Sequence, residues 1–202
     1  MGLLSTTTSV TQYQVEGQLD EPIIDTISKG LKKKAIFDID GDPSQVAAGW
    51  TSFKTPYEPS FEDSSFLIGT DFIFSLRIDK KSIPPKLVQK QVLQQSVKRQ
   101  KALKREFLSR EEKNAIKEGI IASLNLKTPS IPNIYDVVWQ YEKGVVWFFT
   151  NLKTANEHLE DLFFKSFGLH LIRKIPYTSA AFDKTLNSAE LDRLNRLSSA
   201  EN

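Results

Sequence analysis

Cysteine is absent from this chain of 202 residues, and histidine and methionine are scarce, at two and one. The absence of cysteine excludes disulfides, thiolate metal sites and cysteine nucleophiles, and it fits a reducing compartment. The two histidines, His158 and His170, do not have the H-x₃-H or H-E-x-x-H spacing that binds zinc. We therefore expect neither a metal site nor a cofactor.

Long apolar runs are also missing, since none reaches the roughly 18 residues that span a bilayer. Residues 1–11 have neither the charged start nor the apolar core of a secretory signal. Phosphate-binding loops, dinucleotide-binding glycine motifs and the G-x-S-x-G elbow do not occur. These absences predict a cytoplasmic protein with no membrane contact and no small-molecule substrate.

The chain does contain enough apolar residues for a folded core, at 40% hydrophobic and 26% charged. Strand-like and helix-like periods occur along it, which predicts an α+β fold of antiparallel sheets with packed helices and a projecting basic helical hairpin. We expect an N-terminal α+β subdomain, the hairpin, a ββαβ subdomain that completes the core, and a helical tail. Their expected ranges are 1–82, 83–128, 129–180 and 181–202.

The N-terminal part combines strand and helix signals. Residues 9–16 alternate apolar and polar side chains as a half-buried strand does, and Glu21–Pro22 opens a helix because proline suits a first-turn position. Residues 43–62 contain three prolines and are expected to be irregular. Residues 65–78 are rich in Phe and Ile and predict one long strand bent at Gly69.

The hairpin region predicts two consecutive helices. After Ile83–Pro85, residues 86–107 contain no Gly or Pro and would form a helix about 30 Å long. Ser109 followed by Glu112 is a capping box, which starts a second helix that runs to Leu124. The apolar stripe of the first helix is narrow, so this helix is expected to project or to pack on one partner only.

Strand signals dominate after the hairpin. Two apolar segments flank a tight turn, a second capping box starts a helix that ends at a glycine, and a strand and an amphipathic helix follow. In chain order, these expected elements are the strands 134–141 and 145–150 around Gly144, the helix from Thr154–Glu157 to Gly168, the strand 169–175 and the helix 187–199.

One motif, Ile36–Gly41, suggests an enzyme, because an apolar segment is followed by D-x-D-G. In haloacid-dehalogenase-type phosphatases, such a pair of aspartates supplies a nucleophile and an acid/base beside a metal. Here Asp42 stands where Thr or Val should follow, and Pro43 obstructs the helix expected next. Because Asp and Gly are common in turns, we interpret Asp38 and Asp40 as a strand ending in an acidic turn and expect no enzyme.

Positive charge is concentrated in one segment. Residues 80–118 carry 12 Lys and Arg against 4 Glu, whereas residues 1–79 carry 6 against 12 acidic residues. Phosphate binding needs many cations, and nine of these twelve are Lys, which favours backbone contact over base readout. A solvated lysine-rich hairpin is the simpler alternative. The candidate DNA-binding residues are Lys80, Lys81, Lys86, Lys90, Lys98, Arg99, Lys101, Lys104, Arg105, Arg110, Lys113 and Lys117.

Two further features leave alternatives open. Trp139, Trp147 and the aromatic residues beside them could stack on the bases of a single strand, although such residues in strands are usually core. The narrow apolar stripe over residues 88–97 could be a seam between subunits. The second candidate function is therefore a protein-interaction module that uses the hairpin for oligomerisation or partner binding.

Several features follow one another in the order of a known family. Gly49-Trp50 follows the acidic turn, and the expected long strand runs into Arg77–Pro84. The Lys- and Gln-rich helix pair comes next, followed by the aromatic hairpin at Gly144, the helix to Gly168 and the strand to Ile175-Pro176. With this order of features, the chain resembles the RdgC family of recombination-associated bacterial DNA-binding proteins over most of its length.

The resemblance implies a non-enzymatic protein that binds double-stranded DNA with little sequence preference and limits access of the RecA recombinase. It also implies a homodimer that encircles DNA, in which the hairpin is the projecting tip and its Lys and Arg face the DNA. Such a protein would be associated with the nucleoid. Asp38 and Asp40 then fall in a segment that is not catalytic in the family.

Overall fold

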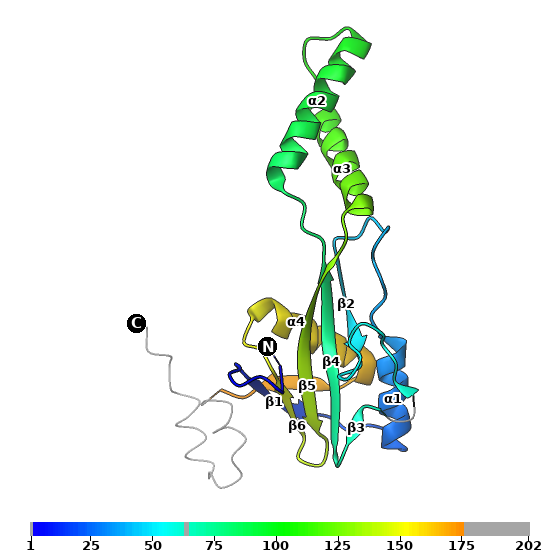
Figure 1. Ribbon diagram of the computed structural model, residues 1–202, viewed down its shortest axis with the longest axis vertical. Helices are drawn as coiled ribbons and strands as arrows, with labels where there is room; N and C mark the ends of the chain where they lie inside the picture. The colour runs from blue at the N-terminus through cyan, green and yellow to red at the C-terminus, as the bar shows by residue number, and fades with distance from the viewer. Residues whose placement is uncertain (1, 63–64, 176–202) are drawn as a thin grey trace, which may run out of the picture. The chain divides into compact units, whose positions relative to one another are not determined.

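The structure, a computed structural model, describes residues 2–62 and 65–175 (Figure 1). Within these residues the chain forms four helices and an antiparallel sheet, which confirms the expected mixture of helix and sheet. The helix expected over 187–199, with the rest of the tail 181–202, lies outside the described residues. The helices are α1 (Ile23–Lys33), α2 (Pro85–Leu103), α3 (Arg110–Lys127) and α4 (Lys153–Phe167), and the strands are β1 (Thr11–Glu16), β2 (Val46–Thr51), β3 (Leu67–Ile68), β4 (Asp71–Lys80), β5 (Ile131–Gln140), β6 (Val145–Phe148) and β7 (His170–Arg173).

The sheet has the strand order β2-β4-β5-β6-β1-β7, with β3 paired to β4. β1 lies between β6 and β7 and is antiparallel to both, so that Tyr13 stands opposite Val146 on one side and Arg173 on the other. β5 and β6 form the hairpin expected from the sequence. Its turn holds Gly144 at a φ of 62°, a left-handed conformation that side chains disfavour and glycine adopts freely.

The chain divides into two compact units. The first comprises the described residues within 1–35, 50–76 and 135–202, and the second comprises 36–49 and 77–134. The divisions fall inside β2, β4 and β5, so each of these strands contributes residues to both units. The first unit contains α1 and α4, and the second contains α2 and α3.

An aromatic core holds the first unit together. The rings of Trp139 and Phe163 are fully buried and their centroids lie 4.9 Å apart, and Trp50 meets Phe74 edge-on at 5.1 Å. Each buried aromatic side chain removes about 150–250 Å² from water, so these residues supply a large share of the hydrophobic stabilisation. Trp139 and Phe148 are fully buried and belong to the core, whereas Trp147 is 37% exposed and does not.

A buried hydroxyl joins β1 to α4. Tyr13 is fully buried, and its Oη lies 2.6 Å from Asn156 Oδ1 and 2.9 Å from Glu160 Oε1, so its proton is donated to these acceptors. Burial, and then the hydrogen bond to Glu160, raise the pKa of Tyr13 well above its ordinary value. Tyr13 therefore stays neutral and fixes the strand to the helix that covers it.

The structure corrects the expected strands of the N-terminal half. The single strand expected over 65–78 is two strands, because Gly69, with φ of 65°, reverses the chain between β3 and β4 instead of bending it. The segment 43–62 is not wholly irregular, since it contains β2. The strand expected before Asp40 is absent, and only an isolated bridge joins Ala35 to Trp50. The run of Ala and Gly in β2 has no clear alternation, so only pairing within the sheet identifies it as a strand.

One expected helix start is also wrong. α4 begins at Lys153 after an N-cap, Leu152, that makes no side-chain capping bond, so Thr154 lies inside the helix instead of capping it. The expected end of this helix is confirmed, because Gly168 adopts φ of 69° as its C-cap.

Candidate nucleic-acid interface

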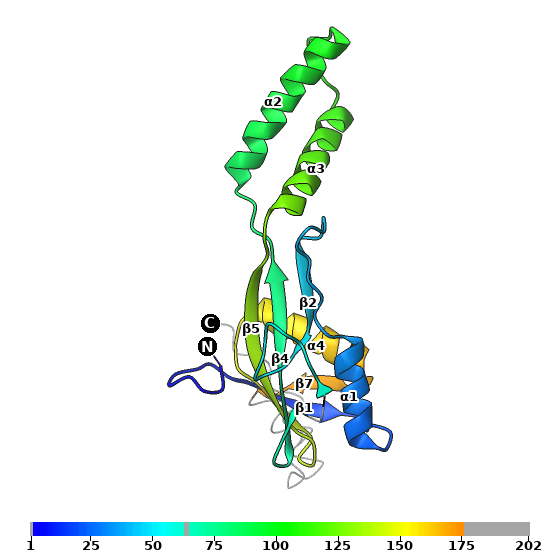
Figure 2. The ribbon, with the colours of Figure 1, turned by 45° about the vertical axis from the view of Figure 1, so that its right-hand side comes forward.

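The two helices of the second unit lie side by side, as two views show (Figures 1 and 2). α2 starts at Pro85, where proline costs no hydrogen bond, and ends at Leu103; its C-cap residue, Lys104, has a left-handed φ of 50°. The capping box is confirmed: Glu112 N donates to Ser109 Oγ at 3.1 Å, and Ser109 N donates to Glu112 Oε2 at 2.8 Å. The expected helix over 86–107 is therefore shorter, and the capped helix starts where the sequence predicts.

These helices bury almost nothing. α2 contains no buried residue, and α3 contains one, Asn125. The apolar side chains of Leu93 and Val97 are 68% and 48% exposed, and Phe107 in the connecting loop is 74% exposed. Most helical stability in proteins comes from packing of an apolar face. Because α2 and α3 bury so few side chains, this pair is not built around an apolar core of its own.

Eleven of the twelve candidate cations are exposed. Arg105 has a carboxylate near it, with Nη1 3.9 Å from Glu112 Oε1, and exposed pairs of this length contribute little. The exposed cations are Lys80 at the end of β4, Lys86, Lys90, Lys98, Arg99 and Lys101 on α2, Lys104 and Arg105 in the loop, and Arg110, Lys113 and Lys117 on α3.

On α3 the two signs of charge are separated by helical spacing. Arg110, Lys113 and Lys117 are three and four residues apart, which places them on one side of the helix. Glu111 and Glu118 are seven residues apart and lie together on another side, roughly 100° away. A polyanion can therefore contact the cations of α3 without approaching these two carboxylates.

Lys81 differs from the other candidates because its side chain is buried, with 4% exposed. Its Nζ donates to the backbone oxygens of Asp42 at 2.6 Å and Asn125 at 2.8 Å. Lys80, its neighbour in the sequence, is exposed at the end of β4. Lys81 therefore links the end of β4 to the end of α3, and it is not among the cations that a ligand could reach.

The aspartates of the D-x-D-G motif hold turns. Asp38 Oδ1 accepts from Asp40 N at 2.8 Å, Asp40 Oδ1 accepts from Ser130 N at 2.8 Å, and Asp42 Oδ1 accepts from Ser44 N at 2.7 Å. The hydrogen bonds from Ser130 and Ser44 lower the pKa of Asp40 and of Asp42. Within residues 2–62 and 65–175, no three His, Asp or Glu side chains are grouped so that they could hold a metal ion.

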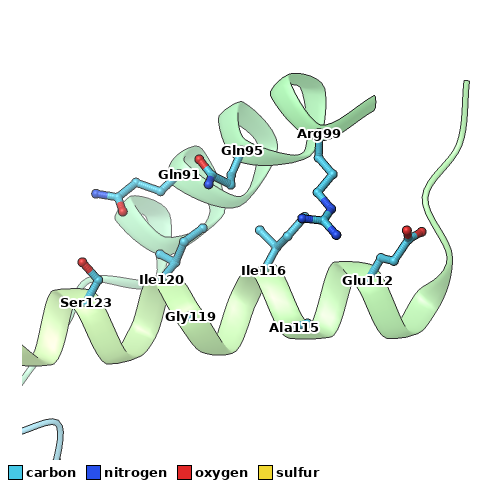
Figure 3. Close-up of a pocket in the computed structure, with 9 residues that line it drawn as sticks. All are labelled: Gln91, Gln95, Arg99, Glu112, Ala115, Ile116, Gly119, Ile120 and Ser123. Carbon is cyan, nitrogen blue, oxygen red and sulfur yellow. The ribbon is translucent and has the colours of Figure 1, made fainter. Parts of the chain in front are cut away.

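A cleft of about 510 Å³ lies between α2 and α3 (Figure 3). Gln91, Gln95 and Arg99 line it from α2, and Ile116 and Ile120 line it from α3; the Arg99 side chain extends toward α3. The rest of the lining is Glu112, Ala115, Gly119 and Ser123. Sequence reasoning missed this cleft, although the spacing of the two glutamines and the arginine, four residues apart, puts them on one face of a helix.

In the part of the chain that the structure describes, no helix is long and apolar enough to cross a membrane. The chain matches no protein-family model and no curated protein.

Proposed function

We propose that this chain binds DNA, mainly double-stranded and without reading its sequence, in a role linked to recombination where it limits access of a recombinase to the DNA. The observation that carries the proposal is the set of eleven exposed cations on α2, on α3, in the loop between them and at the end of β4. Eight of the eleven are Lys, which is a point charge suited to phosphate, and exposed cations of this kind supply sequence-independent affinity. The resemblance of the sequence to the RdgC family supports the same function.

The size of the cation set gives the expected strength of salt dependence. α2 has 19 residues and is about 28 Å long, which corresponds to roughly eight base pairs of duplex. Contact with about four to six phosphates would give a slope of log K against log salt of about −4 to −5. A slope near zero would contradict binding through these cations.

The test is binding of a labelled duplex of about 40 base pairs over a salt series, with an unrelated duplex as competitor. The variant changes Lys98, Arg99, Lys101, Lys104 and Arg105 to Glu, and it is expected to abolish binding while leaving the fold intact. Equal competition by the unrelated duplex would support binding without sequence preference.

A matched control changes the same number of exposed lysines in the first unit, namely Lys29, Lys33, Lys54, Lys143 and Lys153, to Glu. Both variants alter the net charge of the protein equally, so only a local role of the hairpin predicts that they differ. Equal loss of binding in both would mean that net charge and not the hairpin attracts DNA. Unchanged binding in the hairpin variant would refute the proposal.

The exposed apolar side chains favour a second candidate function, a protein-interaction module. Leu93 and Val97 lie four residues apart on one side of α2 and are 68% and 48% exposed. A helix or a second copy that covers them would remove this area from water. Replacing both residues with Ser should then reduce the mass measured by light scattering. An unchanged mass would mean that no second copy covers these two side chains.

A further inference from the structure

The cleft between α2 and α3 is lined by hydrogen-bonding groups along its α2 side (Figure 3). Gln91, Gln95 and Arg99 follow one another at intervals of four residues, which corresponds to about 6 Å along the helix. Among the hydrogen bonds of the described residues, neither Gln91 nor Gln95 has a side-chain partner in the protein. Two amides therefore present free donors and acceptors to whatever occupies the cleft.

The α3 side of the cleft is aliphatic, and the space beside it is open. Ile116 and Ile120 face the amides from α3 (Figure 3). A Cβ placed on Gly119 would meet no atom within 4 Å, so the space beside this part of α3 is empty. A flat ligand can rest on the two isoleucines while its edge reaches the amides across the cleft.

An additional helix is a poor occupant. Helices dock through apolar stripes, and an apolar side chain over Gln91 and Gln95 would bury their amide groups without hydrogen-bond partners, which is unfavourable. A ligand that carries its own donors and acceptors along its length incurs no such penalty. The lining therefore selects a hydrogen-bonding ligand over an apolar one.

The charges in and around the cleft limit which ligands fit it. The surrounding exposed cations attract a polyanion. Inside the cleft, the negative charge of Glu112, whose pKa the hydrogen bond from Ser109 N lowers, lies near the positive charge of Arg99, so the lining carries no net charge. A phosphate inside the cleft would meet that carboxylate. A ligand that places a neutral group inside the cleft and its phosphates outside among the lysines avoids this repulsion and still contacts the exposed cations.

Resting on the proposed DNA binding, we infer that the cleft holds unpaired bases of a DNA strand whose phosphates lie along the exposed lysines. Amides form paired hydrogen bonds with base edges, and unpaired bases expose edges that pairing hides. A duplex is too wide to enter a cleft between two helices, so it contacts only the outer cations. The protein should therefore bind a duplex with a single-stranded overhang more tightly than a continuous duplex with the same number of phosphates.

The test measures Kd for three labelled probes with equal phosphate number: a continuous duplex, a duplex with an overhang and a mixed-sequence single strand. In the variant Gln91→Ala with Gln95→Ala, binding of the overhang and the single strand should weaken about tenfold, while binding of the continuous duplex stays unchanged. Gln94→Ala is the matched control, because Gln94 is exposed on α2 outside the cleft lining, and it should change none of the three values.

A second variant fills the cleft without removing a hydrogen-bonding group. Gly119→Leu places a side chain in open space and improves helix propensity, so α3 should still fold. It should weaken single-strand and overhang binding and leave duplex binding unchanged. Circular dichroism confirms the helix content of each variant.

The outcomes separate the two proposals. If the unmodified protein binds none of the three probes, both the DNA-binding function and this inference are overturned. Normal, salt-dependent duplex binding with no effect of either cleft variant on the single strand would overturn the inference alone. A changed mass of the cleft variants in light scattering, with unchanged binding of the single strand, would also overturn it and assign the cleft to a protein helix.

Discussion

Gly30 of α1 lies against the end of α4, and replacing it with Ala should destabilise the first unit. A Cβ on Gly30 would lie 2.5 Å and 2.8 Å from two ring carbons of Phe167 and 2.8 Å from the backbone oxygen of Ser166. The ring cannot move freely, because it packs 6.1 Å from Trp50 and 5.3 Å from Trp139. The carbonyl belongs to α4 and is equally fixed.

The expected magnitude is the difference between two effects. Overpacking of a core costs about 1–3 kcal/mol, and these contacts, with a backbone atom among them, point to the upper end. Replacing Gly with Ala inside a helix recovers about 1 kcal/mol. The net loss for Gly30→Ala is therefore about 2 kcal/mol, or roughly 4–8 °C in Tm for a chain of this size.

The matched control is Gly119→Ala in α3, where the added Cβ meets nothing within 4 Å. Only the gain in propensity remains, so this variant should stabilise α3 by about 1 kcal/mol. The two effects can be followed separately, because all three tryptophans, Trp50, Trp139 and Trp147, belong to the first unit. Urea unfolding by tryptophan fluorescence should respond to Gly30→Ala, and circular dichroism should respond to both. A Gly30→Ala protein as stable as the unmodified chain would refute the close packing of α1 on α4.

Three further perturbations test local features. Lys104→Gly should stabilise the second unit by about 0.5–1 kcal/mol in urea unfolding followed by circular dichroism, because the left-handed φ of 50° strains a side chain and not glycine; a loss would contradict that geometry. Tyr13→Phe should cost about 1–2 kcal/mol by tryptophan fluorescence, since it leaves a buried acceptor on α4 unpaired, and no loss would remove the role given to the hydroxyl. The hydrogen bonds from Ser130 that lower the pKa of Asp40 contribute stability above its ordinary value of 3.8, and this contribution is lost as the pH falls through the lowered pKa. The difference in urea midpoint between the unmodified chain and Asp40→Asn should accordingly shrink below pH 3.8, and a constant difference would count against the bond.

Local chemistry made several elements predictable from the sequence. Ser109 and Glu112 satisfy each other's backbone donors, so a capping box marks a helix start with little help from the rest of the fold. Gly144 and Gly168 occupy left-handed positions that few other residues tolerate, so a turn and a helix end were predicted at the right places. The absence of Gly and Pro after Pro85 predicted the first helix of the pair, and the capping box predicted the second, because both signals depend only on residues close in the sequence.

Other features depended on residues far apart in the chain. β2 is a strand because it pairs within the sheet, and Gly69 reverses the chain because β3 then pairs with β4, neither of which a short window of sequence reveals. Thr154 and Glu157 match a capping box, yet the helix starts at Lys153, before Thr154 could cap it.

The sequence by itself determined the composition of the candidate interface, namely a Lys-rich helix pair with few acidic residues. Only the tertiary structure decided which of these residues are available to a ligand. Lys80 and Lys81 are adjacent in the sequence, but Lys80 is exposed and Lys81 is buried against the backbone oxygens of Asp42 and Asn125. The cleft lined by Gln91 and Gln95 likewise exists only where α2 and α3 face each other, because a cavity is a relation between two surfaces and a sequence pattern describes one surface at a time.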